Sequence, residues 1–118
     1  MAKRILVADD DPGIVDAMQI LLQDEGYEVI TTGDGESIRE CYKLKPDLVF
    51  LDIWMSGING NEMCRTLKSD PETKDVPIIM FSANRDTEDI SRQCGANGFL
   101  CKPFEIKELM NIVHTYLG

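Results

Sequence analysis

Acidic residues directly follow two apolar runs of the chain. Asp9 and Asp10 come after RILVA (4–8), and Asp52 comes after DLVFL (47–51). Carboxylates that lie close together repel one another unless a cation or protons neutralise them. Oxygen ligands without histidine or thiolate suit a hard ion, and a few carboxylates completed by water suit Mg²⁺ better than Ca²⁺. If the folded chain brings these three side chains together, they form a candidate magnesium site.

Two further groups with useful chemistry follow later apolar runs. Ser82 comes after PIIMF (77–81) and offers a hydroxyl donor, and Lys102 comes after GFLC (98–101) and brings a positive charge. Beside a metal-binding acidic cluster, such groups can stabilise a dianionic ligand, and a carboxylate such as Asp52 can act as the nucleophile. These run ends therefore predict a pocket for an anionic group that is bridged to a metal.

The apolar runs alternate with stretches of helical character. EVITT (28–32) is one further apolar run, which brings the number of runs to five. Between the runs, apolar residues recur at the three- and four-residue spacing of a helix. Asp11 followed by Pro12 is typical of a helix start, and Gly26 is typical of a helix end. The pattern predicts five strands and five helices in alternation.

The fourth helical stretch differs from the others. DTEDISRQC (86–94) offers only Ile90 and Cys94 for burial. Because packing of an apolar face provides most of the stability of a helix in a protein, this helix is predicted to be the least firmly anchored.

The alternation predicts an α/β fold, a doubly wound five-stranded parallel sheet with helices on both faces. The runs at 4–8, 47–51 and 77–81 are apolar throughout and belong inside the sheet, whereas 28–32 and 98–101 suit its edges. With right-handed crossovers the simplest strand order is 2-1-3-4-5, the flavodoxin-like (βα)5 arrangement. Ligands of such sheets bind outside the carboxyl ends of the strands, where the order reverses between strands one and three. The acidic residues are therefore predicted to converge at this reversal.

Each candidate residue also has an ordinary structural explanation when it is taken alone. Asp11 is best explained as a helix cap, and Asp9 or Asp10 alone would fit a turn. Serine and a Lys-Pro pair are also common where strands end. Four strand ends that carry complementary groups at one sheet edge favour a functional site over these separate explanations.

Composition narrows the classes of protein to which the chain can belong. Its 118 residues predict one domain, 1–118, and 21 Asp and Glu against 12 Lys and Arg give a net charge of −9. Because no basic stripe is present, direct nucleic-acid binding is not expected. No apolar run suits a signal peptide or a bilayer crossing, so a cytoplasmic location without membrane insertion is predicted.

The cysteines carry no metal-binding pattern. Cys41, Cys64, Cys94 and Cys101 lack CxxC spacing, and His114 is the one histidine of the chain. We therefore expect free, buried thiols in a reducing compartment and no zinc site.

Four stretches of the sequence together resemble the receiver domain of response regulators, over essentially the whole chain. They are ILVADDDP (5–12), PDLVFLDIWMSGINGNEM (46–63), VPIIMFSA (76–83) and GANGFLCKPF (95–104). The resemblance implies a signalling phosphoacceptor of a two-component or phosphorelay system, not a metabolic enzyme. Such a domain takes a phosphoryl group from a histidine kinase or a histidine phosphotransfer protein, with Mg²⁺ as cofactor, and loses it slowly by autodephosphorylation.

The resemblance also implies roles for individual residues. Asp52 matches the phosphoacceptor, Asp10 matches a direct Mg²⁺ ligand, and Asp9 matches a ligand that acts mainly through water. The backbone carbonyl of Trp54 matches a further ligand. Ser82 matches the hydroxyl residue that contacts the phosphoryl group.

Three more positions match the family at the fifth strand. Lys102 matches the lysine that pairs with the phosphoryl oxygens, and the bond before Pro103 is expected to be cis. Phe99 matches the switch aromatic, although it lacks the hydroxyl of a tyrosine. A second departure is Ser56, where the family commonly has proline. Neither departure removes a reacting group.

The partners follow from the same resemblance. Downstream proteins are expected to bind the face made by the fourth helix, the fifth strand and the fifth helix.

The chain ends at HTYLG (114–118), where the fifth helix should finish. This end predicts a stand-alone receiver, and a fragment of a larger regulator or hybrid kinase is the alternative. A receiver-like module that binds proteins without phosphorylation is the alternative function.

Overall fold

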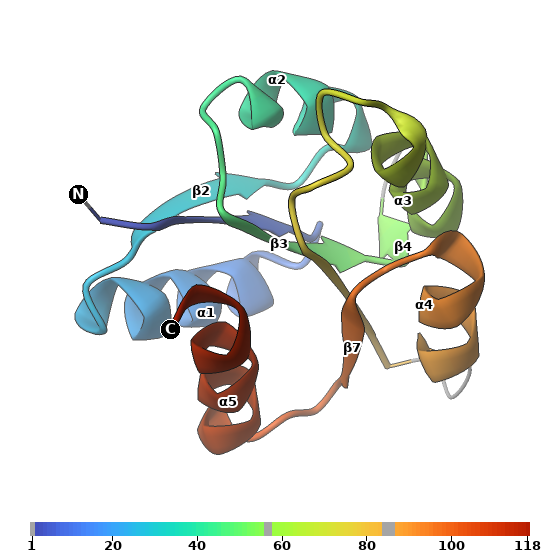
Figure 1. The fold of residues 1–118 in the computed structure, drawn as a ribbon. Coiled ribbons are helices and arrows are strands. Elements are labelled where there is room, and N and C mark those ends of the chain that lie inside the picture. Colours follow the sequence, from blue (N-terminus) through green and yellow to red (C-terminus); the bar gives the residue numbers. More distant parts are fainter. Residues whose placement is uncertain (1, 56–57, 84–86) are drawn as a thin grey trace.

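Five parallel strands form the central sheet of the protein (Figure 1). The structure is a computed structural model that describes residues 2–55, 58–83 and 87–118. The strands occur in the order β2-β1-β3-β6-β7, which confirms the predicted order and the parallel pairing. Their bounds are β1 (Arg4–Ala8), β2 (Glu28–Thr32), β3 (Leu48–Asp52), β6 (Ile78–Ser82) and β7 (Gly98–Cys101).

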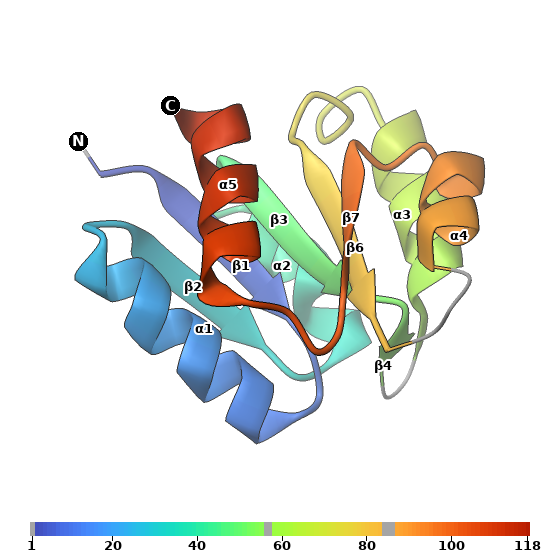
Figure 2. The same ribbon diagram turned by 90° about the horizontal axis from the view of Figure 1, so that it is seen from below.

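Helices cover both faces of this sheet (Figures 1 and 2). On one face lie α1 (Pro12–Asp24) and α5 (Ile106–Leu117), and on the other lie α2 (Ile38–Tyr42), α3 (Gly60–Ser69) and α4 (Thr87–Cys94). A short 3₁₀ helix, η1 (Gly35–Ser37), precedes α2. Side chains of the central strands alternate between two apolar clusters, one under each helical layer. The doubly wound fold is thereby confirmed.

The first helix begins and ends as its sequence predicts. The Asp11 carboxylate accepts hydrogen bonds from the backbone N–H groups of Gly13 (2.9 Å) and Ile14 (3.4 Å), which caps the helix. Gly26 has φ 94°, a left-handed conformation that glycine adopts without steric cost. The helix start also fixes the path of the chain between β1 and α1, where Asp9 and Asp10 lie.

Two strand ends and one hairpin differ from the prediction. β3 and β6 each end one residue later than expected, so Asp52 and Ser82 are the last residues of their strands. β4 (Trp54–Met55) and β5 (Ile58–Asn59) form an antiparallel hairpin that was not predicted. Strands of two residues are too short to show the alternation by which a strand is recognised in a sequence. Ser56, one of the two departures from the family pattern, lies outside the described residues.

The side chains that α4 buries were predicted incorrectly. Cys94 is buried as expected, but Ile90 is only half-buried, and the small polar residues Thr87 and Ser91 are buried instead.

Among the described helices, none combines the length and the apolar character that a bilayer crossing would require.

The expectation of buried thiols holds for part of the set. Cys64 and Cys94 are buried, Cys41 is half-buried, and Cys101 is exposed on β7. Cys101 was predicted wrongly because β7 is an edge strand, whose alternate side chains face solvent.

Candidate functional site

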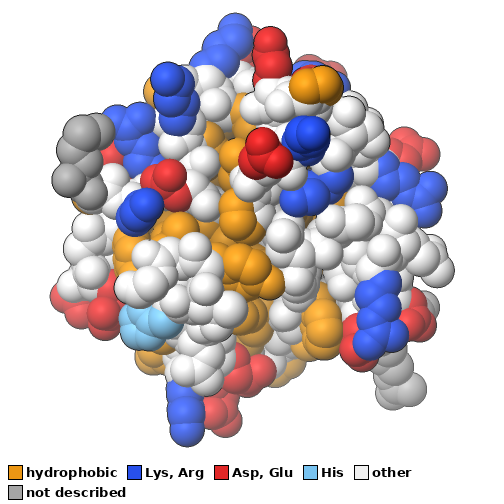
Figure 3. All heavy atoms as spheres, in the orientation of Figure 1, with side chains coloured by type: hydrophobic (Ala, Val, Ile, Leu, Met, Phe, Trp, Pro, Cys, Tyr) orange, Lys and Arg blue, Asp and Glu red, His pale blue; other side chains and the backbone are white. Residues whose placement is uncertain are grey.

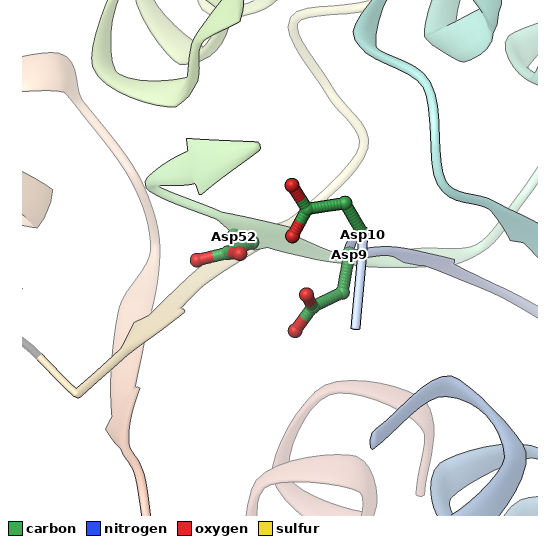
Figure 4. Close-up of side chains that lie close together, drawn as sticks. All are labelled: Asp9, Asp10 and Asp52. Carbon is green, nitrogen blue, oxygen red and sulfur yellow. The ribbon is translucent and has the colours of Figure 1, made fainter. Parts of the chain in front are cut away.

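Three carboxylates meet at the carboxyl ends of β1 and β3 (Figure 4). One oxygen each from Asp9, Asp10 and Asp52 lies within 4.8 Å of the others. Asp9 is 1% exposed and Asp52 5% exposed, whereas Asp10 is exposed to solvent. The sequence therefore predicted correctly that these side chains converge where the strand order reverses.

The Asp9 carboxylate is the most firmly held of the three. Its Oδ1 accepts a hydrogen bond from the Asp11 backbone N–H at 2.9 Å, and its Oδ2 accepts one from Lys102 Nζ at 2.6 Å. The ammonium of Lys102 lies 3.8 Å from Asp52 Oδ2 as well. Charge-assisted hydrogen bonds are the stronger kind, so Lys102 offsets part of the negative charge of the cluster.

The Asp52 carboxylate is held in a partly unfavourable environment. Burial and the negative charge of Asp9 raise the pKa of Asp52 to about 6, although Lys102 and the Trp54 backbone N–H oppose this shift. The Trp54 N–H donates to Asp52 Oδ1 at 3.3 Å. A buried carboxylate whose pKa is raised in this way gains from a cation in the site, because the cation neutralises the charge that burial disfavours.

Lys102 is oriented by its own surroundings. Its ammonium lies 4.7 Å from the centroid of the Phe81 ring, within the range of a cation–π interaction. Its backbone N–H donates to the Ser82 carbonyl at 2.9 Å, which ties the end of β7 to the end of β6. The bond between Lys102 and Pro103 is cis, as predicted.

Ser82 lies beside the acidic cluster at the end of β6. It is buried, and its backbone carbonyl accepts a hydrogen bond from Thr87 Oγ1 at 3.5 Å. Because Thr87 is the first residue of α4, this contact connects the strand end to the start of the helix. A displacement of Ser82 would therefore change a hydrogen bond of the first residue of α4.

Trp54 and Phe99 are the two aromatic residues for which the family resemblance implies a role. Trp54 is 57% exposed, and its backbone pairs with Asn59 in the β4–β5 hairpin. Phe99 pairs with Met80 across β6 and β7, and its side chain is 38% exposed. Both aromatic side chains are thus partly accessible to solvent.

Gly60 is a residue of the site that the sequence analysis missed. A Cβ atom at Gly60 would overlap the backbone oxygen of Asp52 and would lie 2.8 Å from Ile53 Cα. The Gly60 N–H donates to the Ile53 carbonyl at 2.8 Å. The start of α3 can therefore lie directly against the residue that carries the Asp52 carboxylate only because position 60 has no side chain. The signal available in the sequence was Asn59-Gly60, a cap and a glycine at a helix start.

A pocket of about 660 Å³ lies away from this cluster. Its lining includes Lys45, Pro46 and Asp47, which precede β3, and Val76, which precedes β6. The pocket therefore lies at the amino ends of the strands, at the sheet edge opposite the carboxylates. Its charged side chains are of both signs, so it shows no preference for one kind of ligand.

Comparison with known proteins identifies the family. The sequence model of one protein family, the response regulator receiver domain, matches residues 5–114 of the chain. The chain belongs to the response-regulator receiver domains. Domains of this family are signalling phosphoacceptors of two-component systems that act with a histidine kinase.

Similar proteins cover this receiver domain from end to end. The DNA-binding response regulator MtrA of Mycolicibacterium smegmatis is 40% identical over 120 residues, which are 99% of this chain and 51% of that protein. The chain thus spans about half the length of the curated relatives that it matches. A putative response regulator from Chloroflexus aurantiacus has a TM-score of 0.92 at 32% identity, with 99% of this chain and 98% of that chain covered.

A third relative contains the metal that the sequence predicted. The receiver domain of the sensor histidine kinase PA1611 from Pseudomonas aeruginosa was solved with a magnesium ion coordinated in its active-site cleft. It has a TM-score of 0.88 at 26% identity, and the match covers 98% of both chains. The carboxylate cluster of this receiver domain fits such an ion, because it supplies only oxygen ligands, two of them buried.

Proposed function

We propose that this receiver domain accepts a phosphoryl group on Asp52 in a Mg²⁺-dependent reaction. The observation that carries the proposal is the surroundings of Asp52, a buried carboxylate that shares a cluster with Asp9 and Asp10 and lies 3.8 Å from Lys102 Nζ. An Asp52 oxygen attacks the phosphorus, and the bond from phosphorus to the donor breaks. The donor leaves with the electron pair of that bond.

The other site residues have supporting roles in this proposal. Asp9, Asp10, Asp52 and the carbonyl of Trp54 would hold Mg²⁺, with Asp9 acting mainly through water; when bound, the ion offsets the charge of the phosphoryl oxygens. Lys102 binds a phosphoryl oxygen after it exchanges its present ion pair with Asp9. Ser82 donates a hydrogen bond to another oxygen.

The phosphodonor in the cell is proposed to be the histidine of a kinase or of a phosphotransfer protein. The signal ends by slow hydrolysis of the aspartyl phosphate. The proposed surface for a downstream protein consists of α4, β7 and α5, where Phe99 and Ile106 are exposed. In Figure 3 the hydrophobic side chains are grouped mainly near the centre of the view. Although MtrA is named a DNA-binding regulator, we propose that this acidic segment itself acts through proteins.

Phosphorylation by a small donor tests this function. With Mg²⁺ and an acyl phosphate, the intact mass of the protein should rise by one phosphoryl group, and addition of EDTA should prevent the rise. Asp52→Asn should abolish labelling. Asp11→Asn is the matched control, because asparagine also caps a helix, and it should be labelled normally.

Two results would contradict the proposal. Labelling of Asp52→Asn at the wild-type rate would show that another residue is the acceptor. Absence of labelling in the folded wild-type protein, together with normal binding of a partner, would favour a module that works without phosphorylation.

A further inference from the structure

A pair of cysteines joins α3 to α4 on the face opposite α5. Cys64 belongs to α3, Cys94 is the last residue of α4, and their sulfur atoms lie 2.8 Å apart. Both side chains are buried. The remaining two cysteines, half-buried Cys41 and exposed Cys101, provide internal controls for reactivity.

The two thiols are not equivalent. The hydrogen bond between the two thiols lowers the pKa of Cys94 to about 7, while the same hydrogen bond and burial raise the pKa of Cys64. Cys94 Sγ also lies 3.4 Å from the Ser91 carbonyl oxygen, and Cys64 Sγ lies 3.5 Å from the Cys94 carbonyl oxygen. Because the thiolate is the reactive form of cysteine, one partner is suited to react first and the other to follow.

The packing of α4 allows an oxidant to reach the pair. The helix buries Thr87, Ser91 and Cys94, all of them small side chains. Because few apolar contacts are lost when such a helix moves outward, local opening of α4 needs less free energy than global unfolding. A small oxidant can therefore reach sulfur atoms that are buried in the closed structure.

We propose that Cys64 and Cys94 form a reversible intramolecular disulfide that fixes α4 against α3. The bond length of a disulfide is about 2.05 Å, so the two sulfur atoms need only a small approach. The proposed site is a modification site on two adjacent helices, separate from the acidic cluster.

The proposed oxidant is hydrogen peroxide, which reacts with the pair in two steps. The Cys94 thiolate attacks one peroxide oxygen, the O–O bond breaks, and a sulfenic acid and hydroxide form. The Cys64 sulfur then attacks the Cys94 sulfur, the S–O bond breaks, and hydroxide leaves with the proton of Cys64 as water. Two thiols are oxidised to one disulfide, and one peroxide is reduced to two waters. A dithiol reverses the modification by exchange.

The disulfide would act on the element that adjoins the phosphoryl site. Thr87 at the start of α4 donates to the Ser82 carbonyl, so a helix that is fixed at Cys94 resists displacement of Ser82. Oxidation is therefore expected to slow phosphorylation of Asp52 severalfold. This consequence rests on the proposed function, whereas formation of the disulfide does not.

The experiment uses the Cys41→Ser, Cys101→Ser protein, in which only the proposed pair remains. After treatment with hydrogen peroxide and alkylation under denaturing conditions, the monomer should have lost two hydrogens and should carry no alkyl group. Trypsin should release a linked product of peptides 44–65 and 93–107, and dithiothreitol should separate them. Cys64→Ser in the same background should show no loss of two hydrogens; should that variant fail to fold, the linked peptides decide the question by themselves.

Two outcomes would overturn the proposal. One is full alkylation of both thiols after a peroxide dose that oxidises Cys101 in the Cys41→Ser protein. The other is a link between two chains instead of within one. If the disulfide forms but reduced protein is not labelled at Asp52, the proposed function fails and the redox site stands. Slower hydrogen exchange of residues 87–94 on oxidation would confirm that α4 has been fixed.

Discussion

Helices α5 and α4 lie on opposite faces of the sheet beside β7, but they are held by different kinds of side chain. α5 buries Leu109 and Val113, which pack with Leu100 of β7. α4 buries two small polar residues and one cysteine. Buried apolar area stabilises by about 25 cal/mol per Å², so α5 is the more firmly anchored helix. One neighbour of β7 is thus a fixed support, and the other is the element that a ligand can move at low cost.

The largest expected effect tests this difference in anchoring directly. Leu109→Ala in α5 should lower the free energy of unfolding by about 2–5 kcal/mol, because it removes buried methyl groups and leaves a cavity. Ser91→Ala in α4 removes one hydrogen bond to the Glu88 carbonyl and should cost at most about 1.5 kcal/mol. Urea denaturation of both variants measures the two losses. Equal losses would remove the basis for calling α4 the mobile neighbour.

The second prediction concerns the carboxylate that lies between the two helical layers. The raised pKa of Asp52, about 6, means that the folded protein holds a proton that the unfolded chain releases near pH 4. In the absence of Mg²⁺, the contribution of Asp52 to stability should therefore fall as pH rises from about 4 to about 6 and should remain lower above that range. Asp52→Asn should be more stable than wild type at pH 7.5, by on the order of 2 kcal/mol.

Denaturation in EDTA at several pH values measures this gap. The gap should shrink toward pH 5, where Asp52 is protonated in the wild-type protein. A gap that does not change with pH would show that the carboxylate is not destabilised by its surroundings.

A third prediction asks whether α3, the helix on which α4 packs, is itself a fixed support. Gly60→Ala places a methyl group against the Asp52 carbonyl, so it should cost about 1–3 kcal/mol of stability and should weaken Mg²⁺-dependent labelling. Gly33→Ala is the matched control, because a Cβ there would lie 3.5 Å from the Asp9 carbonyl oxygen, an ordinary contact. Melting temperatures and labelling rates separate the two. Equal behaviour would mean that α3 tolerates displacement.

The fourth prediction follows the comparison into the phosphorylated state. As Ser82 moves toward the phosphoryl group, α4 should shift and Phe99 should turn inward, so hydrogen exchange should change mainly within residues 82–105. A change of about tenfold in rate corresponds to about 1.4 kcal/mol, a reasonable size for a two-state shift. Buried amides of α5 should change little. Changes confined to α2 would contradict the assignment of α4 as the responding helix.

The smallest expected effect concerns the lifetime of the phosphoryl group. Water must approach the phosphorus opposite the Asp52 oxygen, and Trp54 and Asn84 are the residues expected to flank that approach. Trp54 is 57% exposed, and Asn84 lies outside the described residues. Trp54→Ala should hydrolyse severalfold faster, a barrier change of about 1 kcal/mol. The decay of phosphorylated protein after donor removal, at fixed Mg²⁺, measures it. An unchanged decay would leave Trp54 as a surface contact only.

Much of the fold was predictable because apolar runs and helical spacing are local properties. The alternation defined the strands within one residue, and the polarity of EVITT placed β2 at an edge. The β4–β5 hairpin was missed because two-residue strands have no detectable period. The buried residues of α4 were missed because burial of Thr87 and Ser91 depends on what lies opposite them, not on their own polarity.

The sequence by itself determined which groups reach the carboxyl edge of the sheet, because strand order and parallel direction bring Asp9, Asp10 and Asp52 to one edge whatever the packing details. Only the tertiary structure decided how these groups are partnered. Lys102 lies closer to Asp9, at 2.6 Å, than to Asp52, at 3.8 Å.

The same limit applies to close approaches elsewhere in the chain. Gly60 lies against the Asp52 carbonyl, and Cys64 lies 2.8 Å from Cys94, thirty residues away. Spacing along the chain specifies the face of an element on which a residue lies, but distances of a few ångströms between elements depend on how whole side chains pack. For this reason the chemistry of the site could be predicted from the sequence, while its present ion pairs and the thiol pair could not.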